Sequence, residues 1–329
     1  MTKDIWVFIE QNQGNIANVS LELLNEAVCL QKKMSDPGKI AAVVIGHDVE
    51  QLGKTCMEYG AEKVYTADDE RLKLYQPEYY ASVLVKLIKS HDPHILLFGA
   101  TYTGSQLAPM VAVRVKTGVA AHSIELKIDG NDNMIAVVPA FGGKVLGDIL
   151  IPQHRPQMAS IKPGILNKAE ERHTDGEVET VNLDFLKDLE ITLQPLRICK
   201  EEIKGIPLEE AEIVVCGGFG VGDKEHWNML QQLAEKLGGS VGCTRPAVDE
   251  GWADGEHLMI GTSGKSIRPK VYIGFGISGA THHICGMKDS GMIININRDE
   301  SADVFKVSDV GLVGDAKEIL PLLIESIGK

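Results

Sequence analysis

Two patterns of apolar residues alternate along the first half of the chain. Short continuous apolar runs predict buried strands at residues 5–10, 40–45, 63–65 and 95–99. Between and after these runs, apolar residues recur at helical spacing and predict helices at residues 20–33, 49–59, 77–90 and 105–115, with Ser20 as the cap of the first. Strands that alternate with helices indicate an α/β fold with a largely parallel sheet, and residues 139–164 are expected to add strands near its end.

The second half repeats the alternation after a polar stretch. Residues 213–215, 240–243, 271–275 and 292–296 are strand candidates, residues 226–237 predict a helix, and a last helix opens after Gly314-Asp315. The charged and proline-flanked composition of residues 194–207 is typical of a connector. We therefore expect two α/β domains, at residues 1–200 and 205–329, each a mostly parallel sheet with flanking helices, the second a doubly wound nucleotide-binding fold.

Composition excludes several classes of protein. The 329 residues are 44% hydrophobic, enough for globular cores, but no apolar run approaches the roughly 20 residues that span a bilayer. A net charge of −13 argues against nucleic-acid binding. The six cysteines are scattered without the spacing of a metal site, so we expect no metal and no membrane insertion, with the cytoplasm as the simplest location.

Glycine-rich turns follow three of the expected strands. Residues 276–279 (Gly-Ile-Ser-Gly) stand between a strand and a short helix, an arrangement that lets a ligand approach the backbone closely and is typical of a phosphate site. Residues 217–222 form a second such turn. Residues 99–104 form a third, which reads either as a phosphate turn or, more often, as a structural connection. His154 has no sequence-evident acid–base partner, which favours a structural histidine over a catalytic base.

The last sixty residues resemble the FAD-binding signature of electron transfer flavoprotein alpha subunits. The matching segments are GISGA at 276–280, His283, GMKDS at 286–290, INRD at 296–299 and GLVGD at 311–315. Residues 99–118 and 140–164 are similar to the first domain of the same family, so the resemblance covers essentially the whole chain. In that family the first domain packs against a beta subunit and holds no nucleotide, which favours the structural interpretation of residues 99–104.

The resemblance implies FAD as the cofactor. Its binding residues would be Thr244, Arg245, Ile260, Gly261, Thr262, Ser263, Ser278, Gly279, Ala280, Thr281, His282, His283, Asn297, Asp315 and Ala316. Arg245 would lie over the flavin ring, where a planar, permanent charge suits a reduced ring. Ser263 would offer a hydroxyl toward flavin N5, and His283 a donor or positive charge near the C2 carbonyl.

This chain departs from the family pattern at several positions, among them Ser263, which replaces a threonine and keeps its hydroxyl. Phe219 stands where the family has an arginine, and it would pack against the cofactor or fill core space. Thr262 replaces a glutamine. His282 has no family counterpart and is expected to be exposed.

The resemblance also implies partners. It predicts a heterodimer with a beta subunit and exchange of electrons with an acyl-CoA dehydrogenase-type flavoprotein; a complex that also engages ferredoxin and NADH is left open. No acid–base pair or activated nucleophile stands out, so we expect no catalytic residues and an electron carrier without substrate chemistry of its own. The alternatives are a nicotinamide-dependent dehydrogenase, although neither glycine turn fits its GxGxxG pattern well, and a cofactor-free interaction subunit.

Overall fold

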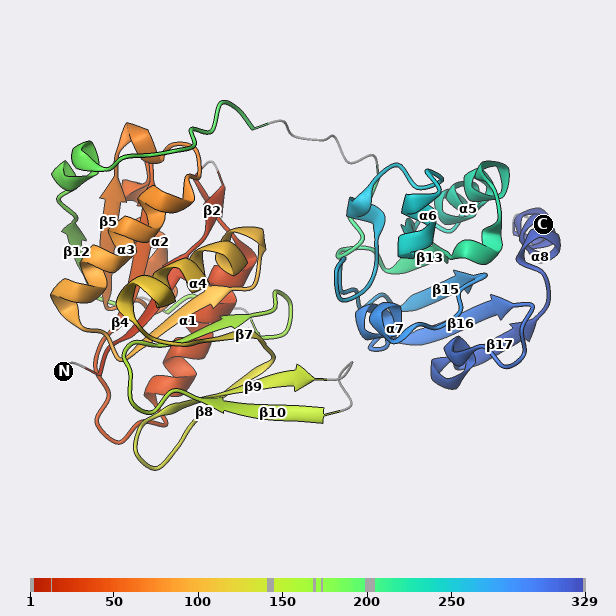
Figure 1. Ribbon diagram of the computed structural model, residues 1–329. Coiled ribbons are helices and arrows are strands. Elements are labelled where there is room, and N and C mark those ends of the chain that lie inside the picture. The colour runs from red at the N-terminus through yellow and green to blue at the C-terminus, as the bar shows by residue number, and fades with distance from the viewer. Residues whose placement is uncertain are drawn as a thin grey trace. The chain divides into compact units, whose positions relative to one another are not determined.

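The computed structural model describes residues 3–12, 14–140, 145–167, 170–172, 174–198 and 205–327 (Figure 1). The chain divides into two compact units, Met1–Cys199 and Lys200–Lys329. Each unit is built on a parallel sheet flanked by helices, which confirms the predicted α/β fold class. Of the predicted connector at 194–207, residues 199–204 lie outside the described residues.

The first unit contains a seven-stranded sheet in the order β12-β5-β4-β1-β6-β11-β7, in which every neighbouring pair is parallel. Its strands are β1 (Ile5–Ile9), β4 (Ile40–Gly46), β5 (Lys63–Asp68), β6 (Ile95–Gly99), β7 (Val119–Ser123), β11 (Gln157–Ile161) and β12 (Glu177–Thr180). The short strands β2 (Gln11–Asn12) and β3 (Asn15–Ile16) pair with each other.

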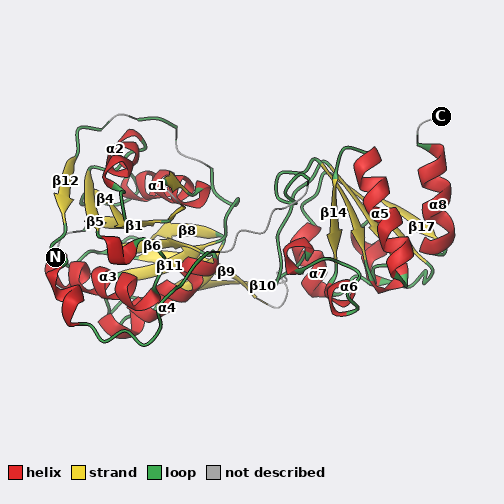
Figure 2. Cartoon of the chain, turned by 90° about the horizontal axis from the view of Figure 1, so that it is seen from above, coloured by secondary structure: helices red, strands yellow, loops and turns green. Residues whose placement is uncertain are grey.

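Helices cover both faces of this sheet (Figure 2). They are α1 (Asn18–Gln31), α2 (Glu50–Glu58), α3 (Pro77–His91) and α4 (Tyr102–Val115). Side chains of β1 alternate between the faces: Ile5, Val7 and Ile9 pack with α1 and α2, whereas Trp6 and Phe8 pack with α3 and α4. Burial on both faces explains why the strands read as continuous apolar runs.

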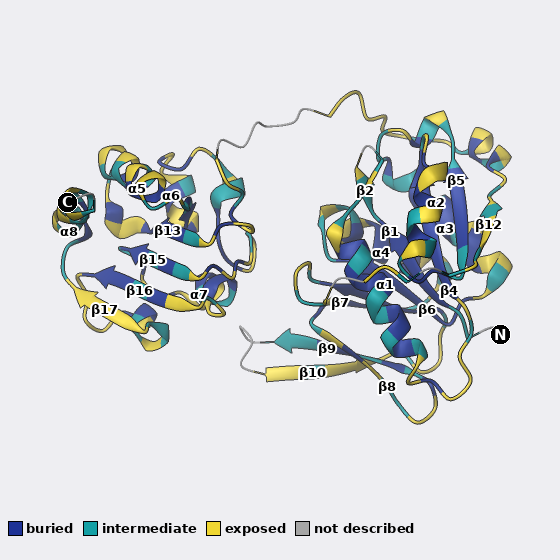
Figure 3. Cartoon of the chain, turned by 180° about the vertical axis from the view of Figure 1, so that it is seen from behind, coloured by how far each residue is buried: buried dark blue, intermediate teal, exposed yellow. Residues whose placement is uncertain are grey.

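A separate antiparallel sheet projects from the first unit in the order β10-β9-β8. Its strands are β8 (Glu125–Ile128), β9 (Met134–Ala140) and β10 (Val145–Leu150). The inner strand β9 contributes to the core, but the edge strand β10 leaves the apolar side chains Val145, Leu146, Ile149 and Leu150 exposed (Figure 3).

The second unit holds a five-stranded parallel sheet in the order β14-β13-β15-β16-β17. Its elements are β13 (Ile213–Gly217), α5 (Lys224–Lys236), β14 (Ser240–Cys243), α6 (Arg245–Asp249), β15 (Val271–Phe275), α7 (Thr281–Met287), β16 (Met292–Asn297), β17 (Val310–Val313) and α8 (Ala316–Ser326). Side chains of α5, α6 and α8 fill the core on one face, and Met287 of α7 belongs to the core on the other.

Several local features differ from the sequence-based expectation, and the strands β7, β8 and β17 were not predicted. Ser20 does not cap α1, because the helix begins one turn earlier, at Asn18 with Ala17 as the capping position; the buried Ser20 hydroxyl instead accepts from the backbone N–H of Glu10 at 2.8 Å. The strand β12 was not predicted, because its sequence Glu-Val-Glu-Thr is polar. It lies at the edge of the sheet, where one side of a strand is solvated.

Among the described residues, no helix is both long and apolar enough to cross a membrane. The same residues contain no group of three or more His, Cys, Asp or Glu side chains that could hold a metal ion. No disulfide joins the five cysteines within the described ranges.

Candidate functional site

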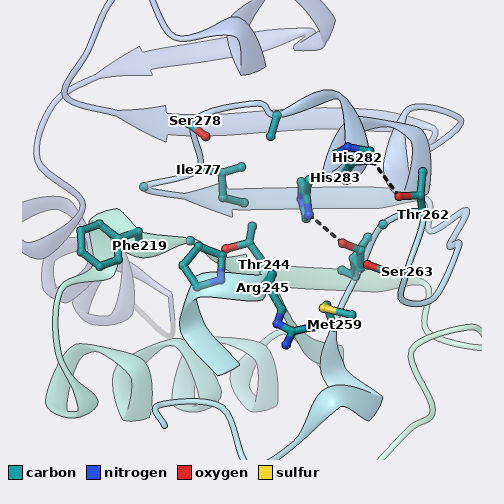
Figure 4. A pocket seen from close by; sticks show the side chains of 16 residues that line it. Phe219, Thr244, Arg245, Met259, Thr262, Ser263, Ile277, Ser278, His282 and His283 are labelled. Carbon is teal, nitrogen blue, oxygen red and sulfur yellow. Dashed lines mark hydrogen bonds between the residues drawn. The ribbon is translucent and has the colours of Figure 1, made fainter. Parts of the chain in front are cut away.

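A hollow of about 280 Å³ lies in the second unit at the carboxyl ends of its central strands, and sixteen residues line it (Figure 4). After β13 the chain forms β14 on one side of that strand and then crosses to form β15 on the other side. The strand order therefore reverses at β13 and β15. This is the place where doubly wound sheets bind their ligands.

The glycine turns at 217–222 and 276–279 interlock at the floor of this hollow. Gly220 N–H donates to Gly276 O at 2.9 Å, and Gly218 N–H donates to Phe275 O at 2.9 Å. A Cβ on Gly220 would lie 2.6 Å from the Gly276 Cα, and one on Gly279 would lie 2.1 Å from the backbone nitrogen of Val304. These glycines are thus required by backbone-to-backbone packing, a reason different from the close ligand approach that the sequence suggested.

The hollow collects ten of the fifteen predicted cofactor-binding residues. They are Thr244, Arg245, Ile260, Gly261, Thr262, Ser263, Ser278, Ala280, His282 and His283. The other five, Gly279, Thr281, Asn297, Asp315 and Ala316, do not line it.

Three of those five have structural partners. The buried Asn297 donates through Nδ2 to Ile277 O at 2.7 Å and so fixes the 276–279 turn. Asp315 caps α8 by accepting from Lys317 N–H at 2.9 Å, and Ala316 is buried in the core. The Gly314 N–H also donates to Asn297 O at 3.0 Å, so the glycine turn, the end of β16 and the start of α8 are linked by hydrogen bonds.

Arg245 brings the permanent positive charge of the site. It is the first residue of α6, and its side chain is 58% exposed and lines the hollow. Its Nε donates to Asp249 Oδ1 at 2.8 Å, and its Nη1 lies 3.7 Å from Glu256 Oε1. Arg245 therefore lines the pocket, while its guanidinium belongs to a surface ion-pair cluster with Asp249 and Glu256.

Hydroxyl groups supply most of the remaining polarity of the wall. Thr244 stands at the capping position of α6, but its side chain makes no capping hydrogen bond. Ser263 and Ser278 are exposed and face the same hollow from different loops. Hydroxyls can donate or accept, so this wall can bind the carbonyl and ring-nitrogen atoms of a polar heterocycle.

The two adjacent histidines have opposite environments. His283 is 5% exposed, its Nδ1 lies 3.0 Å from Ile260 O, and its Nε2 lies 2.8 Å from the Tyr272 hydroxyl. Since the Ile260 carbonyl can only accept, Nδ1 carries the proton and Nε2 accepts from Tyr272. Burial lowers the pKa of His283 to about 4. The ring is therefore neutral with both nitrogens engaged, so it does not offer the free donor or charge expected from the sequence.

His282 is exposed, as predicted, and it contacts the loop that carries Thr262. Its Nδ1 lies 3.0 Å from the Thr262 hydroxyl, and its backbone carbonyl accepts from Thr262 N–H at 2.9 Å. A Cβ on Gly261 would lie 2.7 Å from that same carbonyl. Two positions at which this chain departs from the family thus contact each other and set the position of the 261–264 loop.

Phe219 is a pocket residue that the sequence reasoning did not include in the site. It lines the hollow, is 62% exposed and stacks on Trp252, which excludes the core-filling role considered for it. An aromatic residue flanked by glycines at the end of a strand was the signal available in the sequence.

Of the two sequence features of the first unit that suggested chemistry, the turn at 99–104 has a structural explanation, whereas the exposed side chain of His154 does not show the structural role predicted for it. In the turn at 99–104, Thr101 caps α4 by accepting from Gly104 N–H at 3.0 Å, and its hydroxyl donates to Glu10. A Cβ on Gly104 would collide with Gly99 O, so this glycine is needed where helix meets strand. The side chain of His154 is exposed; Arg155 organises this corner, with its Nε 3.0 Å from Nδ1 of the buried His94.

Each of the two units matches the model of a known protein family. Residues 5–186 match the model of the electron transfer flavoprotein domain, and residues 207–288 match that of the electron transfer flavoprotein FAD-binding domain. The second match contains every residue of the hollow.

Curated relatives align over almost the full chain. An electron transfer flavoprotein subunit alpha of Thermoanaerobacterium thermosaccharolyticum is 42% identical, with 99% of this chain and 98% of the relative covered. An acryloyl-CoA reductase electron transfer subunit beta of Anaerotignum propionicum is 35% identical, covering 99% and 95%. Subunit LctC of a lactate dehydrogenase (NAD(+),ferredoxin) of Acetobacterium woodii is 36% identical, covering 99% and 77%.

Proposed function

The chain belongs to the electron transfer flavoprotein family as an FAD-binding alpha subunit, and from this premise we propose that the hollow at the ends of β13 and β15 holds the flavin ring. We further propose that the first unit pairs with a beta subunit. The resulting heterodimer carries electrons between a partner flavoprotein and a second redox centre.

The observation that carries the proposed site is the coincidence of the hollow with the FAD-binding family match. The hollow also fits a flavin ring chemically. It joins a planar cation, Arg245, to hydroxyls at Thr244, Ser263 and Ser278, beside apolar side chains at Met259 and Ile277. Ligand sites combine apolar walls with a few convergent polar groups in this way.

Each residue of the wall has a definite part in this proposal. FAD, when bound, supplies the electron-carrying chemistry, and the protein binds, orients and tunes it. Arg245 favours the more negative state of the ring, because a guanidinium stays charged at all relevant pH values. Ser263 is the hydroxyl donor toward the ring. The neutral His283 positions the wall by tying α7 to the Ile260 carbonyl, and His282 lines the hollow beside Thr262.

The beta-subunit proposal draws support from exposed apolar surface on the first unit. Leu146 in β10 is 57% exposed and Val145 is 52% exposed, while in α4 Tyr102 is 95% and Val113 is 76% exposed. Apolar side chains gathered at an edge strand are typical of surfaces that a partner covers. Both segments fall within residues 99–118 and 140–164, which resemble the domain that packs against a beta subunit in this family.

The electron partners are proposed from chemistry and from the relatives' names. An acyl-CoA dehydrogenase-type flavoprotein is the partner implied by the family resemblance, and one relative is a subunit of an acryloyl-CoA reductase. The name of another relative includes both NAD(+) and ferredoxin. A heterodimer within an electron-bifurcating complex is therefore the second candidate, and the cytoplasm is the proposed location for both.

The experiment is purification of the chain together with its beta subunit, followed by a visible spectrum and quantification of the released nucleotides. One FAD and one AMP for each heterodimer support the simple carrier, whereas two FADs support the bifurcating complex. A purified complex with no visible flavin band refutes the proposed site and revives the cofactor-free interaction subunit. A nicotinamide in place of flavin would instead indicate the dehydrogenase alternative.

A further inference from the structure

Phe219 lies at the strand-order reversal of the second unit. It opens the 3₁₀ turn Phe219–Val221, directly after β13, and it lines the hollow together with Thr244 and Arg245 (Figure 4). Its side chain is 62% exposed. At this place the ring extends the apolar wall that Met259 and Ile277 begin, and ligand sites combine such apolar walls with a few polar groups.

The ring is held in a fixed place. It stacks on Trp252 with 6.0 Å between ring centroids and 24° between ring planes. Trp252 is 9% exposed and packs in the core, and its backbone is anchored at both polar groups: its N–H donates to Ala247 O at 3.0 Å, and Lys224 Nζ donates to its carbonyl at 2.6 Å.

The backbone beneath Phe219 is fixed as well. The hydrogen bonds of Gly218 and Gly220 to the neighbouring turn lie on either side of it in the sequence. An aromatic ring whose orientation is set before binding loses little conformational entropy when a ligand stacks on it.

We propose that Phe219 is a cofactor-stacking residue, which contacts the planar isoalloxazine ring of FAD where the rest of the family is expected to use an arginine. This inference rests on the proposed function, because it takes FAD as the occupant of the hollow. Aromatic side chains stack on flat heterocycles through dispersion and quadrupole interactions, without a hydrogen-bond pattern. Phe219 thus provides contact area where an arginine would provide charge.

Two observations favour the flavin ring over the adenine ring. The hollow, at about 280 Å³, is slightly smaller than the roughly 300–1,000 Å³ of typical ligand pockets, so it accommodates one ring system and not a whole dinucleotide. Arg245 and Ser263, which the resemblance assigns to the flavin ring, line this hollow together with Phe219, whereas Asn297, Asp315 and Ala316 do not.

The test compares two ligands on the heterodimer stripped of flavin. FAD contains both rings, whereas FMN contains the isoalloxazine ring without adenine. Flavin fluorescence titrations give the dissociation constants of both ligands for the wild type, Phe219→Ala and Phe219→Tyr. Leu322→Ala is the matched control, because Leu322 is 65% exposed in the same unit and does not line the hollow.

We expect Phe219→Ala to weaken FAD and FMN alike by roughly tenfold or more, since stacking on an aromatic side chain is worth about 1–3 kcal/mol and 1.4 kcal/mol is tenfold. Phe219→Tyr, which keeps the ring, and Leu322→Ala should bind both ligands as the wild type does. Thermal melts show whether Phe219→Ala is folded, which its exposure leads us to expect.

Two results would overturn the inference while leaving the proposed function intact. If Phe219→Ala weakened FAD but not FMN, the residue would stack on adenine. If neither ligand were weakened, Phe219 would make no cofactor contact. A wild-type heterodimer that bound neither ligand would instead refute the proposed function itself, and this inference with it.

Discussion

The Tyr272 hydroxyl donates to Nε2 of His283 at 2.8 Å, and both side chains are buried in the second unit. The opposite ring nitrogen of His283 donates to Ile260 O at 3.0 Å. A second ring proton would remove the acceptor that Tyr272 needs and would place a charge in an apolar core. Burial is the main reason that the pKa of His283 falls to about 4, although the hydrogen bond to the Ile260 carbonyl acts in the opposite direction.

His283→Gln should change the pH dependence of stability. Because the folded-state pKa of about 4 lies below the ordinary 6.5, the unfolded chain binds a proton between these values that the folded chain does not. The free energy of unfolding therefore falls as the pH drops through this window, by about 3 kcal/mol for 2.5 units at 1.36 kcal/mol each. The variant lacks this contribution, so its stability should approach that of the wild type as the pH falls from 7 to 4.

Urea denaturation at several pH values measures this difference. Contributions from the carboxyl groups are common to both proteins and cancel in the comparison. Leu322→Ala, which removes no titratable group, gives the baseline. Parallel stability curves for the wild type and His283→Gln would show that the imidazole is not held neutral.

Arg245→Ala should lower the one-electron reduction potential of the bound flavin. We expect a fall of about 60 mV, equivalent to a tenfold change in the equilibrium constant. The effect is not larger because the guanidinium is 58% exposed and shared with Asp249 and Glu256. Arg245→Lys keeps the charge but loses the planar donor array, so an intermediate fall is expected.

Reductive titration of protein that retains its flavin measures these potentials. Arg268→Ala is the matched control, because Arg268 is 56% exposed, pairs with Asp289 and does not line the hollow. If Arg245→Ala and Arg268→Ala gave the same potential as the wild type, Arg245 would be a surface ion-pair residue only.

Gly220→Ala should disrupt the floor of the hollow. Its new Cβ would lie 2.6 Å from the Gly276 Cα, and because this neighbour is backbone the two turns must separate. We expect a loss of roughly 1–3 kcal/mol in stability, as for overpacked cores, together with weaker FAD binding. Gly238→Ala is the comparison: Gly238 has φ +67° but open space around it, so it should lose stability through backbone strain without losing FAD affinity. Equal FAD affinities in the two variants would contradict the conclusion that the contact between the two glycine turns shapes the hollow.

Leu146→Asp should weaken pairing with the beta subunit. The side chain is 57% exposed on the edge strand β10, so the variant should fold normally, but a carboxylate there would be buried unpaired in the interface. We expect association to weaken by about tenfold or more, measured by analytical ultracentrifugation. Leu322→Asp places the same charge on the second unit and should pair normally. Pairing of Leu146→Asp with wild-type affinity would exclude β10 from the interface.

Local patterning predicted the strands and helices that a core covers. The apolar runs of β13, β14 and β15 and the helical spacing of α3 and α5 are properties of consecutive residues, because burial on a given face imposes a period of 2 or 3.6 on the sequence itself. The polar edge strand β12 was not found, because an edge strand is selected by the neighbour with which it pairs and not by its own apolar residues.

By itself, the sequence determined the α/β class of this protein, and its motifs predicted ten residues that line the hollow. Tertiary structure decided which residues line the hollow and which hold the surrounding backbone in place. His282 and His283 are adjacent and of one type, yet helical geometry points them to different neighbours, so one contacts Thr262 in solvent and the other is locked neutral by Tyr272. Likewise the glycines at 218, 220 and 276 are required by the contact of two turns that are far apart along the chain. Composition shows which residues could perform chemistry. Their charge and their available hydrogen-bonding atoms depend on burial and long-range contacts, and such contacts exist only in the folded chain.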